Sequence, residues 1–169
     1  MRLTIGVVFC GLALTAGEAL AQRPALTRRS MAGPRLGVTY ITGSRARETL
    51  REHGLSSVIS QFGWHFEQQV SPTGAAGPAF VIEEVVLVGA VEQQKLVPSF
   101  TVLFGMRMPS GLEFGLGPNL SVVGTALAVG IGKNLRYGDV NLPVNLAIVG
   151  SPGALRSSLL VGYAIESSH

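Results

Sequence analysis

Large apolar residues alternate with small or neutral polar residues along most of the chain after residue 34. Every even position from 140 to 148 is Val, Leu or Ile, and so is every odd position from 127 to 131. Successive side chains of a β-strand point to opposite faces, so a period of two indicates strands with one apolar face. A chain with this pattern over most of its length is restricted to an all-β fold.

Residues that favour turns divide the alternating region into eight segments. Gly, Pro, Asn and Asp gather between them, and their backbone preferences suit tight turns. The predicted strands are 35–43, 58–70, 79–92, 95–108, 111–119, 123–136, 139–149 and 155–166. After the first, the connections are too short for a crossover helix, which makes neighbouring strands antiparallel. We therefore predict an all-β, antiparallel, up-and-down β-barrel of about eight strands.

One short helix is expected between the first two strands. Ser44 is placed to cap a helix over 45–53, and Gly54 follows as a stop signal. A helix this short is marginal on its own and needs packing against the strands.

The second face of the strands differs from that of an ordinary half-buried sheet. It holds Gly, Ala, Ser and Asn with isolated charges, and charged residues make up only 14% of the chain. Such a face fits the inside of a narrow barrel, whose apolar face then points to lipid. Strands of about ten residues tilted by about 45° span roughly 23 Å, close to the apolar band of an outer membrane.

The N-terminal segment has the features of an export signal. Arg2 precedes an apolar run over 3–14, and Ala19, Leu20 and Ala21 form an A-x-A cleavage site. We expect a signal peptide over 1–21, a basic mobile lead-in over 22–34 and the barrel domain over 35–166. Cys10, the only cysteine, falls in the signal, so the exported domain has no disulfide.

Several function classes are disfavoured by composition and spacing. A net charge of +3 is too small for a nucleic-acid partner, and the three His show no metal-ligand spacing. No cofactor is expected, since Gly130 and Gly132 open no phosphate-binding helix. His65 and Glu67 share one strand face while Ser60 lies on the other, so a hydrolase would need a serine from another strand. We predict a protein that is not an enzyme.

The isolated charges on the small-residue face predict an interior polar network, because buried polar groups need partners. Its expected members are His65, Glu67, Arg107, Glu113, Asn141 and Asn145. Arg107 and Glu113 flank the turn at 109–111 and should face each other across a hairpin, near enough to its end for water to reach them. Glu83 and Glu84 are adjacent and must point to opposite faces unless a bulge intervenes.

The signal peptide, eight Gly-rich alternating strands, tight turns and absence of a mature cysteine resemble the small eight-stranded outer-membrane β-barrels of Gram-negative bacteria. The resemblance covers about 35–166, and the segments 61–64 and 113–119 look like family-specific stretches. It implies a bacterial outer-membrane location, contact with outer-membrane lipid, and a structural, adhesive or lipid-contacting role. An eight-stranded barrel is just filled by its own side chains, so a wide pore is not expected.

Two alternatives remain open. The small inward residues over 126–132 leave space for a slender apolar ligand, as in a soluble periplasmic or secreted barrel that binds a small apolar molecule. Pro98 and Pro143 favour that alternative, because proline removes a ladder donor and suits an open edge. A lipid-modifying outer-membrane enzyme is the less favoured alternative.

Overall fold

The computed structural model describes residues 25–72, 77–122, 124–138 and 140–167. The predicted signal peptide over 1–21 and its cleavage site lie outside the described residues, as do the first residues of the predicted lead-in. The helices and strands are β1 (Leu26–Thr42), α1 (Ser44–Glu52), β2 (Val58–Pro72), β3 (Ala79–Gly89), the 3-10 helix η1 (Val91–Gln93), β4 (Val97–Arg107), β5 (Leu112–Ser121), β6 (Gly124–Tyr137), β7 (Val140–Ser151), β8 (Ala154–Gly162) and β9 (Ala164–Ser167).

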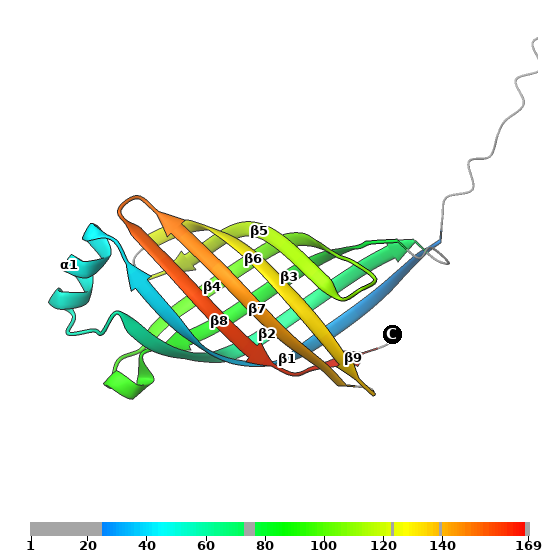
Figure 1. The fold of residues 1–169 in the computed structure, drawn as a ribbon, viewed down its shortest axis with the longest axis horizontal. Helices are drawn as coiled ribbons and strands as arrows, with labels where there is room; N and C mark the ends of the chain where they lie inside the picture. The colour runs from blue at the N-terminus through cyan, green and yellow to red at the C-terminus, as the bar shows by residue number, and fades with distance from the viewer. Residues whose placement is uncertain (1–24, 73–76, 123, 139, 168–169) are drawn as a thin grey trace, which may run out of the picture.

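All the strands form one closed antiparallel barrel, and this confirms the predicted fold class (Figure 1). Each strand pairs with its neighbours in sequence, and β1 closes the barrel by pairing with β2 on one side and with β8 and β9 on the other. β8 and β9 act as a single strand interrupted at Tyr163. The interruption lies opposite Leu142 and next to Pro143. β7 pairs with β8 from Val144 onward and with β9 only before that proline, which has no N–H to donate.

The strands run obliquely around the barrel, as Figure 1 shows. Following directly paired residues once around the sheet from Ser30 returns to β1 at Tyr40, ten residues further along. A stagger of this size gives a strand tilt at the upper end of the usual range of about 35–45°. Glycine permits the tight coiling this requires: a Cβ on inward-facing Gly105 would lie 2.1 Å from the carbonyl oxygen of Phe114.

The first strand is longer than the sequence indicates. β1 begins at Leu26, so the prediction of a mobile lead-in over 22–34 is wrong from that residue onward. Residues 26–34 pair with 64–72 of β2 throughout. Arg28 and Arg29 lie before the first residue that pairs with β9, so among the described residues this part of β1 is paired with β2.

The helix α1 forms where it was expected, but its N-terminus is built differently. Gly43, with φ of 116°, is the N-cap residue, and no side chain caps the helix, so Ser44 does not have the predicted role. Instead, the backbone amides of Arg45 and Ala46 donate to the carbonyl oxygen of Gly153, at 3.1 and 3.3 Å, in the turn between β7 and β8. Buried Ala46 and Leu50 complete this docking.

The two ends of the barrel differ in their connections. The helical end carries α1, η1 and the turns β5–β6 and β7–β8. The terminal end carries the other three turns, together with the first residues of β1 and the last residues of β9 (Figure 1).

Candidate functional site

Arg107 is the central residue of an ionic cluster inside the lumen. Its guanidinium donates to both carboxylate oxygens of Glu67 on β2, one at 2.6 Å, and its Nε donates to Glu113 Oε2 on β5 at 2.9 Å. Asn145 on β7 donates from Nδ2 to Glu113 Oε1 at 2.6 Å. A bidentate arginine–carboxylate contact is among the strongest polar contacts in proteins, and here one arginine serves two carboxylates.

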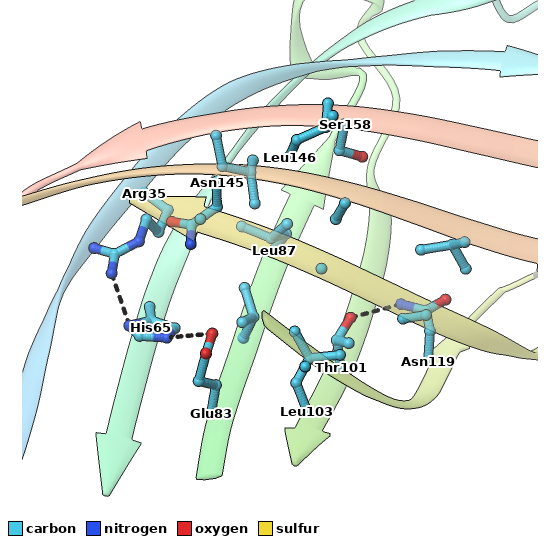
Figure 2. A pocket seen from close by; sticks show the side chains of 18 of the residues that line it. Arg35, His65, Glu83, Leu87, Thr101, Leu103, Asn119, Asn145, Leu146 and Ser158 are labelled. Atoms are coloured by element: carbon cyan, nitrogen blue, oxygen red, sulfur yellow. Dashed lines mark hydrogen bonds and ion pairs between the residues drawn. The ribbon is translucent and has the colours of Figure 1, made fainter. Parts of the chain in front are cut away.

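A second cluster connects the first three strands (Figure 2). Arg35 Nη2 lies 2.7 Å from His65 Nδ1, and His65 Nε2 lies 3.2 Å from Glu83 Oε2. Arginine only donates, so Nδ1 must accept and Nε2 carries the proton that is donated to Glu83. Arg35 Nη1 also donates to the carbonyl oxygen of Tyr163 at 3.1 Å, where β8 gives way to β9.

Neutral hydrogen bonds and a third arginine fill the lumen toward the helical end. Thr39 contacts Gln61 at 2.6 Å and Ser158 at 2.7 Å. Asn119 donates to Thr101 Oγ1 at 2.8 Å and accepts from Arg156 at 2.5 Å. The arginines at 35, 107 and 156 match in number the glutamates at 67, 83 and 113, and at the terminal end of the same inward face Arg29 pairs with Glu166.

The structure brings together most of the predicted network, but in two clusters. Glu67, Arg107, Glu113 and Asn145 form the first cluster, and His65 belongs to the second. Asn141 lies apart near the terminal end, where its Oδ1 accepts from Asn134 Nδ2 at 3.3 Å.

Sequence reasoning missed Arg35 as a lumen residue. The signal was its odd position, which places it on the same face of β1 as buried Thr39. The sequence pattern predicted that Glu83 and Glu84 point to opposite faces of the strand but did not indicate which of them points inward. The structure puts Glu83 in the lumen and Glu84 on the outer face.

A small cavity lies among the described residues in the middle of the lumen. It measures about 60 Å³, enough for a few water molecules, and Arg35, His65, Glu83 and Asn145 are among the polar residues lining it. Small-molecule sites usually measure about 300–1,000 Å³, so this cavity is too small to be one. The space left by the small residues of β6 is taken up by side chains from other strands. A Cβ on Gly130 would lie 3.1 Å from Leu103 Cδ1, and one on Gly132 would lie 2.5 Å from Glu113 Oε1.

The described residues do not assemble a hydrolase triad around His65. Both of its ring nitrogens are engaged, by Arg35 and Glu83, while Ser60 lies on the outward-facing side of β2 and bonds to Glu92 of η1. Within the same described ranges, no group of three or more His, Cys, Asp or Glu is arranged to hold a metal ion.

A wider recess of about 500 Å³ opens at the terminal end. Arg29, Arg107, Lys133 and Arg136 line it together with Glu166. Arg29 pairs with Glu166 at 3.5 Å, and Lys133 Nζ donates to the carbonyl oxygen of Ser110 at 2.5 Å. The recess is open to solvent and ends at buried Arg107.

The outer face of the barrel is apolar on every side. Side chains such as Phe62, Trp64, Leu116, Leu146 and Val161 are 45–60% exposed, whereas Glu67 and Glu113 in the lumen are each 3% exposed. This reverses the usual distribution of a water-soluble protein. No helix in the described part of the chain is long and apolar enough to cross a membrane.

Comparison with known proteins yields structural likeness only. No family model matches the sequence, and no curated protein matches it. Two crystal structures of Ail, the attachment invasion locus protein of Yersinia pestis, are similar in fold, with TM-scores of 0.54 and 0.53. One of them is a complex with the heparin analogue sucrose octasulfate. Sequence identities are 10% and 9%, and each match covers 83% of this chain and 98% of the Ail chain. The chain therefore shares the closed eight-stranded barrel fold of Ail.

Proposed function

We propose that this chain is a barrel that spans the bacterial outer membrane, with a structural and surface-contact role and no wide pore. The observation that carries the proposal is the reversal of the two faces. Charged side chains are buried and paired in the lumen, while large apolar side chains cover the outside of every strand. Removing each such side chain from water is favourable by about 1.5–3 kcal/mol, and a bilayer is the solvent that does so on all sides of a barrel.

The predicted signal peptide and the barrel type favour the outer membrane among the membranes of a bacterium. Antiparallel barrels of this type have short periplasmic turns and longer outer loops. The long connections of this barrel, which carry α1 and η1, are at the helical end. We therefore assign the helical end to the cell exterior and the terminal end to the periplasm.

The helix α1 supports an adhesive contribution to this role. Arg45, Arg47 and Arg51 are exposed on it, and none of them forms an ion pair with another described residue. Ail, which has the same fold, has been crystallised with a polyanionic heparin analogue. The exposed arginines of α1 therefore favour binding to a polyanionic surface.

The content of the lumen distinguishes this proposal from the two alternatives. A soluble carrier would need an apolar site of useful size, and the lumen cavity of about 60 Å³ is too small for one, although apolar side chains such as Leu87 and Leu103 line it beside the polar groups. A lipid-modifying enzyme would need a nucleophile beside a base, and His65 is held by Arg35 and Glu83.

Trp64 provides the test, because it is the only Trp in the chain and lies within the apolar wall between Phe62 and Phe66. Protein folded into phospholipid vesicles should show blue-shifted Trp emission that lipids brominated along the acyl chain quench. Water-soluble iodide should quench it weakly. A protein that stays monomeric in buffer, with its emission quenched by iodide and indifferent to brominated lipid, would overturn the proposal and favour the soluble alternative.

The adhesive contribution has its own test. A variant with Arg45, Arg47 and Arg51 all changed to Gln should elute from an immobilised sulfated polysaccharide at lower salt than the unmodified protein. Arg28→Gln with Arg29→Gln, at the terminal end, is the matched control when the protein is held in vesicles. Equal elution of all three proteins would remove α1 from the binding surface.

A further inference from the structure

Glu84 is an acidic side chain placed at mid-height on an apolar wall. It is the sixth of the eleven residues of β3, and its side chain points outward. Its cross-strand partners are Phe66 on β2 and Val102 on β4, and Ile82 and Val86 flank it along its own face. No hydrogen bond or ion pair joins its carboxyl group to another residue in the described ranges. The other outward acidic groups of these ranges lie in α1 and η1, beyond the wall.

The wall around Glu84 differs in composition from the rest of the outer face. Every Phe and Trp among the described residues points outward, and all of them lie on four consecutive strands, β2 to β5. They are Phe62, Trp64, Phe66, Phe80, Phe100, Phe104 and Phe114. The remaining strands present mainly Val, Leu and Ile, with Tyr40, Tyr137 and Tyr163. We call the outward face of β2 to β5 the aromatic wall.

Lipid chains cannot satisfy a carboxyl group, whereas a second protein surface can. Polar groups inside a bilayer act as contacts between protein segments because hydrocarbon offers them no hydrogen bond. Aromatic side chains supply large, rigid contact surfaces of the kind that concentrate at protein interfaces. The aromatic wall combines both features on one side of the barrel.

The chemistry of the carboxyl group identifies the partner. A neutral carboxyl donates through its hydroxyl and accepts through its carbonyl oxygen, so two such groups satisfy each other across a twofold axis. A twofold axis along the bilayer normal joins residues of equal height on two barrels inserted in the same direction. An axis beside β3 therefore brings Glu84 to Glu84.

We propose that the aromatic wall is the interface of a homodimer within the bilayer, in which the two Glu84 side chains hydrogen-bond across the twofold axis. The proposal rests on the proposed membrane-spanning function. The partner is a second copy of this chain, whose aromatic wall presents the same aromatic side chains around its own Glu84.

The test measures self-association and insertion separately in the same vesicles. Copies labelled with donor and acceptor dyes at the helical end report association, and resistance of the vesicle-bound protein to extraction by sodium carbonate reports insertion. Glu84→Gln keeps a side chain that can pair with itself and should still dimerise. Glu84→Leu should weaken dimerisation at least tenfold while remaining inserted. Phe66→Ala should also weaken it, and Leu146→Ala, at an equally exposed site on β7, should leave it unchanged.

Each alternative result has a defined meaning. Inserted protein without energy transfer overturns the homodimer and leaves the membrane-spanning function intact. Energy transfer that Glu84→Leu does not reduce overturns the role of Glu84, and equal effects of Phe66→Ala and Leu146→Ala overturn the location of the interface. Extraction of every variant from the vesicles by carbonate refutes the membrane-spanning function itself.

Discussion

Arg107 is the only cation that contacts two lumen carboxylates, Glu67 and Glu113, among the described residues. From the sequence, the nearby turn predicted a pair open to water, worth about 1 kcal/mol or less. That prediction is wrong about burial: Arg107 is 8% exposed and Glu113 is 3% exposed. The difference arises because Glu67 approaches from β2, the next strand but one, and contacts the guanidinium over the inner face of β3.

We expect Arg107→Met to lower the free energy of unfolding by about 3–5 kcal/mol, because it leaves two buried carboxylates without a cation. Glu113→Gln should cost less, about 1.5–3 kcal/mol, since Glu67 still pairs with Arg107. Urea unfolding in detergent micelles measures both variants and the double variant. A coupling energy of zero would show that the two side chains do not interact.

Glu92 provides a second prediction, outside the lumen. Its carboxylate accepts from the hydroxyl of Ser60, from the Ser60 backbone N–H at 3.0 Å and from Gln93 Nε2 at 2.8 Å. These hydrogen bonds, the Ser60 hydroxyl first, lower the pKa of Glu92 from 4.5 to about 2.

Because the folded pKa is the lower one, the attachment of η1 to β2 is fully stabilised above pH 4.5 and is lost as the pH falls toward 2. The amide resonance of Ser60 should titrate with a midpoint near 2, and Glu92→Gln should abolish that titration. A midpoint near 4.5 would show that the contacts do not hold the carboxylate in solution.

Among the elements, β6 determines how the lumen is filled. Its inward residues are small, and a Cβ at Gly132 would lie 2.3 Å from Asn145 Nδ2 and 2.5 Å from Glu113 Oε1. Gly132→Ala should therefore break the hydrogen bond between these two side chains and cost about 1.5–3 kcal/mol. Gly150→Ala on β7 is the control, because its nearest atom, Leu155 Cδ1, is 3.8 Å away. Equal stability of the two variants would contradict this packing.

The strands could be predicted from the sequence wherever one face is apolar. β2 to β8 begin and end within about four residues of their predicted limits, because inward and outward residues differ in kind along them. The start of β1 could not be found in this way. Its outward residues there include Leu26, Arg28 and Ser30, which are not consistently apolar or polar. This part of the β1–β2 hairpin extends beyond the apolar band of the outer face, so it shows no alternation.

The contacts of the candidate site could be predicted from the sequence only where both residues lie in the same hairpin. Counting back from the turn at 109–111 places Arg107 opposite Glu113, and the register has them as direct partners. The contact of His65 with Arg35 and Glu83 depends on the pairing of three strands at once, and so does that of Glu67 on β2 with Arg107 on β4. Side-chain contacts of this kind follow from the stagger of the closed barrel, which no local pattern in the sequence encodes.

At the scale of the whole molecule, insertion in a bilayer predicts that the cost of an outward charge depends on depth. Val144 and Val140 both point outward from β7, Val144 within the apolar wall and Val140 at the terminal end. Val144→Arg should lower stability by about 2–4 kcal/mol, and Val140→Arg by about 1 kcal/mol or less. Unfolding by urea in vesicles measures the difference. Equal losses of unfolding free energy would mean that the outward apolar face of β7 does not contact hydrocarbon.

The pairing of β1 with β8 makes the last step of folding a long-range one. Arg35 reaches the carbonyl oxygen of Tyr163 across 128 residues of chain, so the ring forms only after the entropy of a very long loop has been lost. This closure joins the edge of β1 to the edge of β8. A disulfide between Val38→Cys and Leu159→Cys, which are direct partners, should speed folding into micelles when it is formed beforehand. An unchanged rate under oxidising conditions would place the slow step elsewhere, before the two edges meet.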